Sequence, residues 1–397
     1  MFASDVLGCT NGSLSRSRCL GELACVHPIL RHGLALPLLA ACGSPAGSAE
    51  EGDTGTTAFS STDPDSTDGM LPEADGATDS TDTGDVATEG EADHGWVLVW
   101  SDEFDGDAID QLRWEHEVDC WGGGNAEQQC YVAGDDTSFV RDGRLHIVAI
   151  AEPTSGAAVN GDDPAYDPND TSVTLPYRSA RLRTRDLGDW RFGRIEVRAR
   201  LPRGQGTWPA IWMLPSAQAY GGWAASGEID IMEAVNLEVG GENRVYGTLH
   251  YGSYWPQNVH SGLEYTLPGG ALPSDDFHDY AIEWEHGEIR WYVDDHHFAT
   301  QRQDGWYSLH DDGTGQLVVG EGAAPFDQHF HLILNLAVGG AWAGNVNDGG
   351  IDASAFPQTL EIEYVRVYEC SVDPESGHGC ETIGDDAVLV PGHPAPG

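Results

Sequence analysis

Residues Gly227–Val235 read GEIDIMEAV, and this stretch decides which fold the sequence predicts. Polar and apolar residues alternate along most of it, as in a β-strand with one buried face. Glu228 and Asp230 are two residues apart and share a face, whereas Glu233 would point to the opposite face of a regular strand. One extra residue, a β-bulge near Ile231–Met232, would return Glu233 to the first face. We therefore predict a bulged strand that carries three carboxylates on one side.

The neighbouring stretches favour a catalytic interpretation of these acids. Acids that alternate on an isolated strand are more often a solvated face than a site. Here WPAIWMLP (Trp208–Pro215) precedes the strand and YGTLHYG (Tyr246–Gly252) follows it. Aromatic rings stack on the faces of sugars, while paired carboxyl groups cleave glycosidic bonds. The combination therefore indicates a sugar-cleaving site.

In this context the chain resembles glycoside hydrolase family 16, and within it the bacterial laminarinase-like endo-β-1,3-glucanases. The resemblance runs from about Trp96 to Glu369 and rests, in order, on SDEFDG, RSARLRT, WPAIWMLP, GEIDIME, HYG, FHDYAIEW, LNLAVGGAW and EYVRVYE. It implies that Glu228 is the nucleophile, Glu233 the general acid/base, and Asp230 a hydrogen-bond partner of the nucleophile. Three acids so close together cannot all be charged, so we expect the cluster to keep a proton near neutral pH.

The resemblance also implies a set of substrate-binding residues. WGGGNAEQQCY (Trp121–Tyr131) resembles the family's loop WGNNELQYY at the non-reducing-end subsites, although Ala126 replaces an Asn and Cys130 a Tyr. The residues implied to contact substrate are Asn125, Glu127, Gln129, Arg181, Trp208, Trp212, His250 and Trp342. For each aromatic residue, packing in the core is the alternative, and His250 could equally be a hydrogen-bonded histidine at a strand end.

A structural calcium ion is a further implication of the resemblance, and no catalytic cofactor is expected. The residues that correspond to the family's calcium ligands are Glu103, the backbone carbonyl of Gly143, and Glu363, which stands where the family usually has Asp. Oxygen ligands of this kind suit calcium.

The charge of the chain limits its partners. The 397 residues include 65 acids and 19 basic residues, all of them Arg, for a formal net charge of −46. Such a surface repels nucleic acid, anionic membranes and sulfated or uronic polysaccharides. We therefore expect a neutral β-glucan polysaccharide as the partner of a monomeric enzyme. Mixed β-1,3-1,4-glucan is a further candidate substrate; the alternatives are an agar-type galactanase of the same family and a non-catalytic β-glucan-binding protein.

The N-terminal region predicts export. LALPLLAA (Leu34–Ala41) precedes Cys42, which resembles a secretory segment ending in a bacterial lipobox and implies lipidation of the Cys42 thiol. Membrane attachment is expected only through this lipid, because no segment is long enough for a transmembrane helix. An ordinary secretory signal or a chance apolar run is the alternative, and the true start could lie near Val26 or Leu30. We expect an exported protein, either anchored to the cell envelope or secreted.

Composition divides the rest of the chain into parts. Residues 1–42 are the signal and lipobox region, and 43–94 an acidic linker without a core, expected to be disordered. Residues 95–370 are the catalytic domain, and 371–397 a C-terminal tail expected to be mobile apart from a disulfide. Four cysteines remain after Cys42. An even number of cysteines in an exported chain suggests disulfides, with three pairings open. Closeness in sequence favours Cys120–Cys130 and Cys370–Cys380.

The pattern of strands predicts an all-β sandwich. Strands are expected at Trp96–Trp100, Arg144–Ile150, Ser179–Thr184, Gly193–Leu201, Tyr280–Trp284, Ile289–Val293, His331–Val338 and Leu360–Tyr368, with a hairpin turn at His286-Gly287. Ala151–Tyr177, rich in Pro, Asp, Asn and Gly, is expected to be an exposed loop. No long helix-period segment occurs. The resemblance narrows the fold to a β-sandwich jelly roll of two curved antiparallel sheets with a concave substrate cleft.

Overall fold

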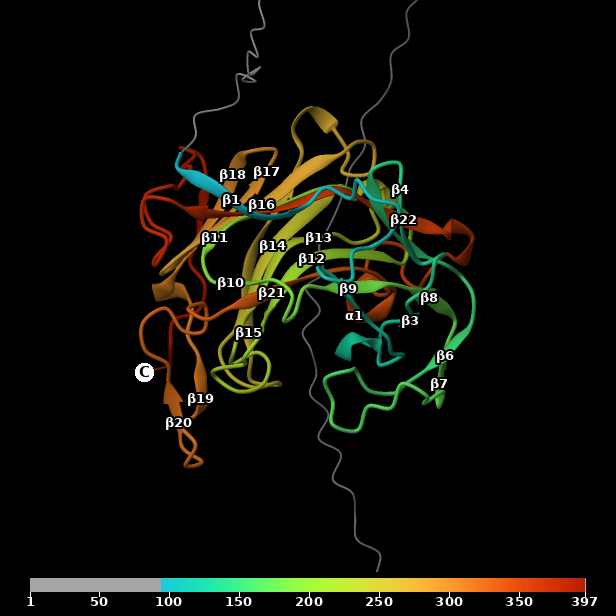
Figure 1. Cartoon of the computed structure of the whole chain (residues 1–397), viewed down its shortest axis with the longest axis horizontal. Coiled ribbons are helices and arrows are strands. Elements are labelled where there is room, and N and C mark those ends of the chain that lie inside the picture. Colours follow the sequence, from blue (N-terminus) through green and yellow to red (C-terminus); the bar gives the residue numbers. More distant parts are fainter. Residues whose placement is uncertain (1–93, 397) are drawn as a thin grey trace, which may run out of the picture. The chain divides into compact units, whose positions relative to one another are not determined.

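The computed structural model describes residues 94–396, which form a sandwich of two β-sheets stacked face to face (Figure 1). All strand pairs of the two sheets are antiparallel except β18–β23. The prediction of an all-β jelly roll is therefore confirmed. The predicted signal region, lipidation at Cys42 and linker lie outside the described residues, apart from His94. Within 94–396, no helix has the length and apolarity needed to cross a bilayer.

Each sheet is built from strands that are far apart in the chain. The first sheet has the order β23-β18-β17-β16-β11-β22-β5-β4, and β1 also pairs with β22. Its strands are β1 (Trp96–Asp102), β4 (Ser138–Arg141), β5 (Arg144–Ala149), β11 (Gly193–Arg200), β16 (His278–Glu285), β17 (Glu288–Val293), β18 (His296–Arg302), β22 (Gln358–Cys370) and β23 (Val388–Val390).

The second sheet has the order β15-β14-β13-β12-β21-β9-β2, and β10 also pairs with β21. Its strands are β2 (Glu115–Glu117), β9 (Arg181–Arg183), β10 (Asp189–Trp190), β12 (Thr207–Pro215), β13 (Glu228–Glu233), β14 (Arg244–Tyr251), β15 (Val259–Thr266) and β21 (Phe330–Val338).

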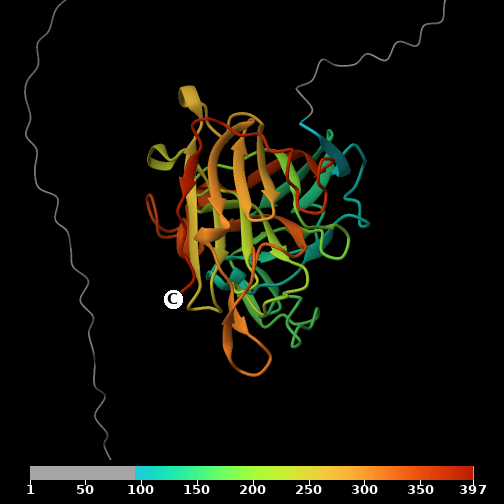
Figure 2. The ribbon, with the colours of Figure 1, turned by 90° about the vertical axis from the view of Figure 1, so that its left-hand side faces the viewer.

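Short ribbons and single helical turns complete the structure. The ribbons pair β3 (Gln129–Tyr131) with β8 (Tyr177–Ser179), β6 (Thr154–Gly156) with β7 (Val173–Leu175), and β19 (Leu309–Asp311) with β20 (Leu317–Val319). The β19–β20 hairpin projects from the sandwich in both ribbon views (Figure 2). The helical turns are η1 (Gly122–Gly124), η2 (Val239–Gly241), η3 (Pro268–Gly270), η4 (Gln303–Gly305), α1 (Gly340–Ala343) and η5 (Ala353–Ala355).

The core lies between the sheets, and several strands present alternate apolar residues to it, whereas β21 is buried along its whole length. In β11, Ile195, Val197 and Ala199 are fully buried, as their spacing predicts. Arg198 lies on the outer face of the first sheet, where it donates hydrogen bonds to Asp279 (2.8 Å) and to Glu363 (2.9 Å). The outer face is therefore covered by ion pairs between strands, whereas the inner face supplies the apolar contact that holds the sheets together.

One side chain crosses the core and fixes the strand that carries the acids. Trp291 of β17 is fully buried, and its indole N–H donates to the backbone carbonyl of Asp230 (2.9 Å). Gly247 of β14 leaves room for this ring, because a Cβ at Gly247 would collide with it. The carbonyl of Asp230 belongs to the irregular part of β13, so the indole satisfies a buried acceptor there.

The segment expected to be one exposed loop, Ala151–Tyr177, has more structure than the sequence indicates. It contains the β6–β7 ribbon, and Tyr177 is buried at the start of β8. The hydroxyl of Tyr166 donates to the carbonyl of Val118 (2.7 Å), beside β2. Alternation is too short in these strands to be recognised, since each has three residues.

The prediction of a mobile C-terminal tail is wrong. The tail is joined to the end of β22 by Cys370–Cys380, and β23 pairs in parallel with β18. Farther on, the backbone N–H of His393 donates to the hydroxyl of Tyr251 (2.8 Å). The tail has few apolar residues, so hydrogen bonds and a covalent link hold it where hydrophobic patterning gave no signal. Both predicted disulfide pairings, this one and Cys120–Cys130, are confirmed.

A chain that ends at Ser371 should be less stable than the full chain. Loss of the Cys370–Cys380 disulfide alone is expected to cost about 2–4 kcal/mol of unfolding free energy. Urea unfolding followed by tryptophan fluorescence measures the difference. A chain that ends at His393 keeps every tail contact described above and is the control. Equal midpoints for the two truncated chains would show that the docked tail contributes nothing.

Candidate active site

The three acids of β13 lie on one face because the strand is bulged, as the spacing predicts. Glu228 pairs with His250 and Asp230 with Thr248, but Glu233 pairs with Tyr246. Between Asp230 and Glu233, β13 thus advances three residues while β14 advances two. The extra residue turns Glu233 back to the face of Glu228, and the core receives both Ile231 and Met232. We call this side of the second sheet, opposite the core, the polar face.

Two tryptophans on different elements each donate to one glutamate. The indole N–H of Trp208 on β12 donates to Glu233 Oε1 (2.8 Å). The indole N–H of Trp223, in the loop before β13, donates to Glu228 Oε2 (2.6 Å). A hydrogen bond to a carboxylate favours the ionised form and fixes its orientation. The two outer acids are therefore held separately, one from each side.

His250 of β14 lies between the other two acids. Its Nε2 is 3.3 Å from Asp230 Oδ2 and 3.9 Å from Glu228 Oε1. Burial lowers the pKa of His250, but the charges of Glu228 and Asp230 raise it more strongly, to about 10. The imidazole is therefore a cation at neutral pH and offsets part of the acidic charge.

Burial raises the pKa of all three carboxyl groups. For Glu228 this is the largest effect, opposed by His250 and by the hydrogen bond from Trp223. The pKa values of Asp230 and Glu233 are raised by burial and by the charge of a neighbouring acid. Removing three buried carboxylates from water together is costly, so the cluster retains a proton near neutrality, in agreement with the expectation from the sequence.

Aromatic side chains line the polar face beside the acids. Trp208 and Trp212 share this face of β12, and the indole N–H of Trp212 donates to Asn335 Oδ1 (2.7 Å). Trp342 of α1 packs edge-on against Trp208 (centroids 5.4 Å apart) and against Tyr246 (5.0 Å). The rings adjoin Glu233, so a molecule that reaches this acid also meets an aromatic surface.

Of the three residues of the Trp121–Tyr131 loop that are implied to contact substrate, two are buried and one is exposed. Glu127 and Gln129 are buried, and Glu127 Oε2 accepts from the Gln129 amide (2.6 Å) and from the Tyr131 hydroxyl (3.2 Å). Gln129 also accepts from the N–H of Val338 (2.7 Å). Asn125 is exposed. Glu127 and Gln129 therefore hold the loop, and Asn125 has the side chain that is open to a ligand.

Arg181 is also placed inside the protein. It is 7% exposed, forms an ion pair with Glu117 (3.2 Å), and lies over the rings of Tyr131 and Trp212. A buried guanidinium paired in this way fixes its aromatic neighbours more than it offers donors to solvent. Its contact with Trp212 makes it a support of the polar face.

Two functional residues were missed by the sequence reasoning. Trp223 lies five positions before Glu228, so its nearness in sequence to the acids was a usable signal. Trp291 lies on the other sheet, and only the fold brings it to Asp230. No local pattern could have identified it.

The residues proposed as calcium ligands do not fit a calcium site. Glu103 accepts two hydrogen bonds from Arg366, at 3.0 and 2.8 Å. Glu363 is paired with Arg144 (3.2 Å) and with Arg198 (2.9 Å). Each carboxylate is thus neutralised by guanidinium groups, which would repel a divalent cation. Arg144, which follows Gly143 in the sequence, is one of the two arginines paired with Glu363.

Among the described residues, a second set of side chains lies close enough together to hold a metal ion, and it belongs to the acid cluster of β13 and β14. Ligand atoms of Glu228, Asp230 and His250 lie within 4.8 Å of one another. The positive charge at this point is supplied by the His250 imidazolium. A hollow of about 510 Å³ lies elsewhere, lined by Arg200–Arg203, Ser274–Asp275, Pro357–Thr359 and Glu361. Of its two acids, Asp275 and Glu361, Glu361 accepts a hydrogen bond from Arg200 (2.6 Å). The open polar face, with its acids and rings, is therefore the candidate active site.

Comparison with known proteins agrees with this placement. Residues 154–310 match Glycosyl hydrolases family 16. The "Beta-glucanase" of Rhodothermus marinus is 42% identical over 288 residues, covering 69% of this chain and 85% of that protein. The "Glucan endo-1,3-beta-glucosidase A1" of Niallia circulans is 39% identical; the match covers 69% of this chain and 38% of that protein.

A solved structure agrees with the computed one. The laminarinase from Rhodothermus marinus superposes with a TM-score of 0.53 and 40% identity, covering 69% of this chain and 97% of that one. Sequence and structure thus agree over the region that carries β12, β13 and β14. The chain belongs to glycoside hydrolase family 16.

Proposed function

We propose that the chain hydrolyses internal β-1,3-glucosidic bonds of laminarin-type glucan with retention of configuration. The observation that carries the proposal is the arrangement on β13, where three carboxyl groups share one face next to the rings of Trp208 and Trp342. Relatives that are named for β-glucan or 1,3-β-glucan cleavage support the substrate class. Mixed β-1,3-1,4-glucan is a second candidate substrate.

The proposed reaction needs only side chains of this site. The carboxylate of Glu228 attacks the anomeric carbon while Glu233 gives its proton to the leaving glycosidic oxygen, so that the sugar becomes an ester of Glu228. Water then attacks the same carbon as Glu233 takes a proton from it, and Glu228 is released. The raised pKa of Glu233 suits a proton donor, and the nearby His250 cation suits an ionised Glu228.

Asp230 is proposed to act through its neighbours. It is 1% exposed and lies in ion-pair contact with His250. Its negative charge favours the imidazolium, which in turn stabilises the carboxylate of Glu228. Asp230 is therefore a positioning and electrostatic residue in this mechanism, and not a proton donor to the substrate.

Two alternatives remain from the sequence. A non-catalytic glucan-binding role is disfavoured because both glutamates are present and each has a raised pKa, which a binding protein does not need. An agar-type galactanase is disfavoured by the relatives named for glucan. The negative net charge of the chain repels sulfated polysaccharides more strongly than a neutral galactan.

We further propose that the protein is exported as a lipoprotein. The apolar run before Cys42 supports this proposal, as do the two disulfides, which form in oxidising compartments. Residues 43–94 would then tether a monomeric catalytic domain to the envelope. Metabolic labelling with a fatty acid, compared between the wild type and Cys42→Ala, tests the lipid.

Cleavage products test the proposed function directly. Laminarin, lichenan and agarose are incubated side by side, and fresh laminarin products are followed by proton NMR. We expect rapid cleavage of laminarin into oligosaccharides with the β-anomer appearing first. Agarose as the preferred substrate would refute the glucanase assignment, and an initial α-anomer would refute retention.

Replacing either glutamate should remove most turnover. Glu228→Gln and Glu233→Gln are each expected to lower kcat by about 10²–10⁴-fold or more, because each removes a proton-transfer or nucleophilic step. Binding of laminari-oligosaccharides, measured by calorimetry, should persist. Glu375→Gln changes an exposed glutamate of the tail and serves as the control. Near-wild-type kcat in Glu233→Gln would contradict its role as the acid.

The pKa of His250 should fall in Asp230→Asn. The substitution removes one of the three carboxylates, Glu228, Asp230 and Glu233, that stabilise the imidazolium, so the ring loses its proton at a lower pH than in the wild type. NMR titration of the imidazole resonances measures the shift. His331 is the internal control, since burial and the charges of Arg183 and Arg185 hold its pKa at about 3. An unchanged His250 titration would mean that Asp230 does not stabilise this cation.

A further inference from the structure

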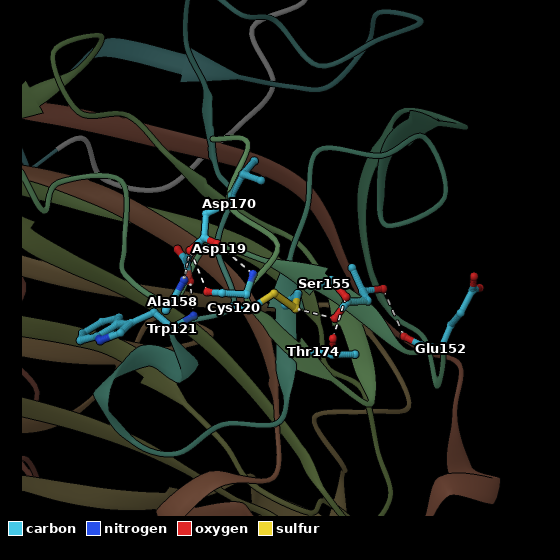
Figure 3. Close-up of a disulfide and its surroundings, with 12 residues drawn as sticks. Asp119, Cys120, Trp121, Glu152, Ser155, Ala158, Asp170 and Thr174 are labelled. Carbon is cyan, nitrogen blue, oxygen red and sulfur yellow. Dashed lines mark hydrogen bonds between the residues drawn. A yellow bond between two sulfur atoms is a disulfide. The ribbon is translucent and has the colours of Figure 1, made fainter. Parts of the chain in front are cut away.

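The Cys120–Cys130 disulfide closes a ring around the glycine-rich loop Trp121–Gln129, which we call the Trp121 loop. The two cysteines are ten positions apart and almost fully buried, with exposures of 4% and 0%. Asp119 and Tyr131, just outside the ring, exchange two backbone hydrogen bonds of 3.1 and 2.8 Å. Figure 3 shows the disulfide with Asp119 and Trp121 beside it. The ends of the loop are therefore fixed twice.

Within the ring, the backbone has little conformational preference of its own. Gly122, Gly123 and Gly124 all have positive φ, and so does Ala126 (φ 56°). Successive glycines have wide backbone freedom, so an open chain of this composition would sample many conformations. The side chain of Trp121 is 42% exposed at the start of this loop. Its position in space thus depends on what holds the ends of the loop.

The far side of the loop touches the polar face. The carbonyl of Asn125 accepts from the N–H of Ala341 (2.7 Å), next to Trp342. Gly340 is packed so tightly that a Cβ there would lie 3.2 Å from Glu127 Cγ and 3.3 Å from Trp208 Cζ3. Trp208 is the residue that donates to Glu233. The Trp121 loop therefore borders the aromatic surface next to this acid.

The disulfide is supported from behind by the β6–β7 ribbon (Figure 3). The N–H of Cys120 donates to the carbonyl of Ala157 (2.7 Å), and Cys130 Sγ lies 3.2 Å from the carbonyl oxygen of Thr154. Gly156 has no side chain at the closest approach, where a Cβ would lie 2.8 Å from Cys120 Sγ. The cross-link is thus wedged between the ribbon and the Trp121 loop.

We propose that the Cys120–Cys130 disulfide positions the Trp121 loop for substrate, so that the exposed Trp121 ring stacks on a glucosyl unit away from the bond that is cut. This inference rests on the proposed function. Cys120 and Cys130 are positioning residues, since they touch the loop and not the sugar. A ring held in place binds with a smaller loss of conformational entropy than a free one. The disulfide therefore sets the preference for long glucan chains.

The test compares two disulfides that close loops of the same number of residues. Cys120→Ala/Cys130→Ala and Cys370→Ala/Cys380→Ala each open a cross-link with a sequence separation of 10 residues, so both affect the unfolded chain alike. kcat and KM are measured on laminari-oligosaccharides of increasing length. For the first variant we expect KM for the longest chains to rise about ten-fold, with kcat on the shortest cleaved chain unchanged. The second variant should keep the wild-type dependence on length.

A substitution of the exposed Trp121 tests the inference without opening a disulfide, so a change in stability does not confuse the result. Trp121→Ala leaves both disulfides in place and should show the same loss of preference for long chains. An unchanged length dependence in Trp121→Ala, or an equal change in the two double variants, would overturn the inference while the wild type still cleaves laminarin. A wild type inactive on every β-glucan would instead overturn the proposed function, and this inference with it.

Discussion

The hydrogen bond from the indole of Trp291 to the carbonyl of Asp230 is the interaction on which the arrangement of the site depends. A bulge leaves backbone groups without their usual partner in the neighbouring strand. Inside a sandwich such a group must find another partner, since water is excluded. Trp291 provides it from the opposite sheet, and Gly247 leaves the space that the ring needs. The packing of the two sheets thus determines where the bulge lies, and the bulge determines which acids meet.

The site places three carboxyl groups where burial disfavours their charged form. Asp230 is almost completely buried, and Glu228 and Glu233 are half-buried beside it. The His250 cation and the indole donors of Trp208 and Trp223 offset only part of this cost. The remainder keeps protons on carboxyl groups near neutral pH. The free-energy cost of these buried acids is offset by the apolar faces of the two sheets, which are buried against each other.

Local patterns in the sequence were sufficient for strands such as β11 and for the bulge of β13, but not for the three-residue strands of the β6–β7 ribbon. The alternation in β11 and the spacing of the acids in β13 both follow from the two-residue period of a strand. Contacts between distant elements could not be read in this way. The ion pairs of Glu103 and Glu363 with arginines involve partners on other strands, and these pairs argue against the calcium site that the resemblance implied. The tail was misjudged for the same reason, because its hydrogen bonds leave no periodic signal.

The pairing of β23 with β18 has a consequence for how molecules meet one another. In the first sheet β18 would otherwise be the outermost strand, with unpaired N–H and C=O groups along one side. Exposed edges of this kind recruit strands from other chains and start aggregation. Residues Val388–Val390 occupy part of that edge from within the same molecule. The tail thus blocks extension of the sheet by another chain, which helps the protein to stay monodisperse at high concentration.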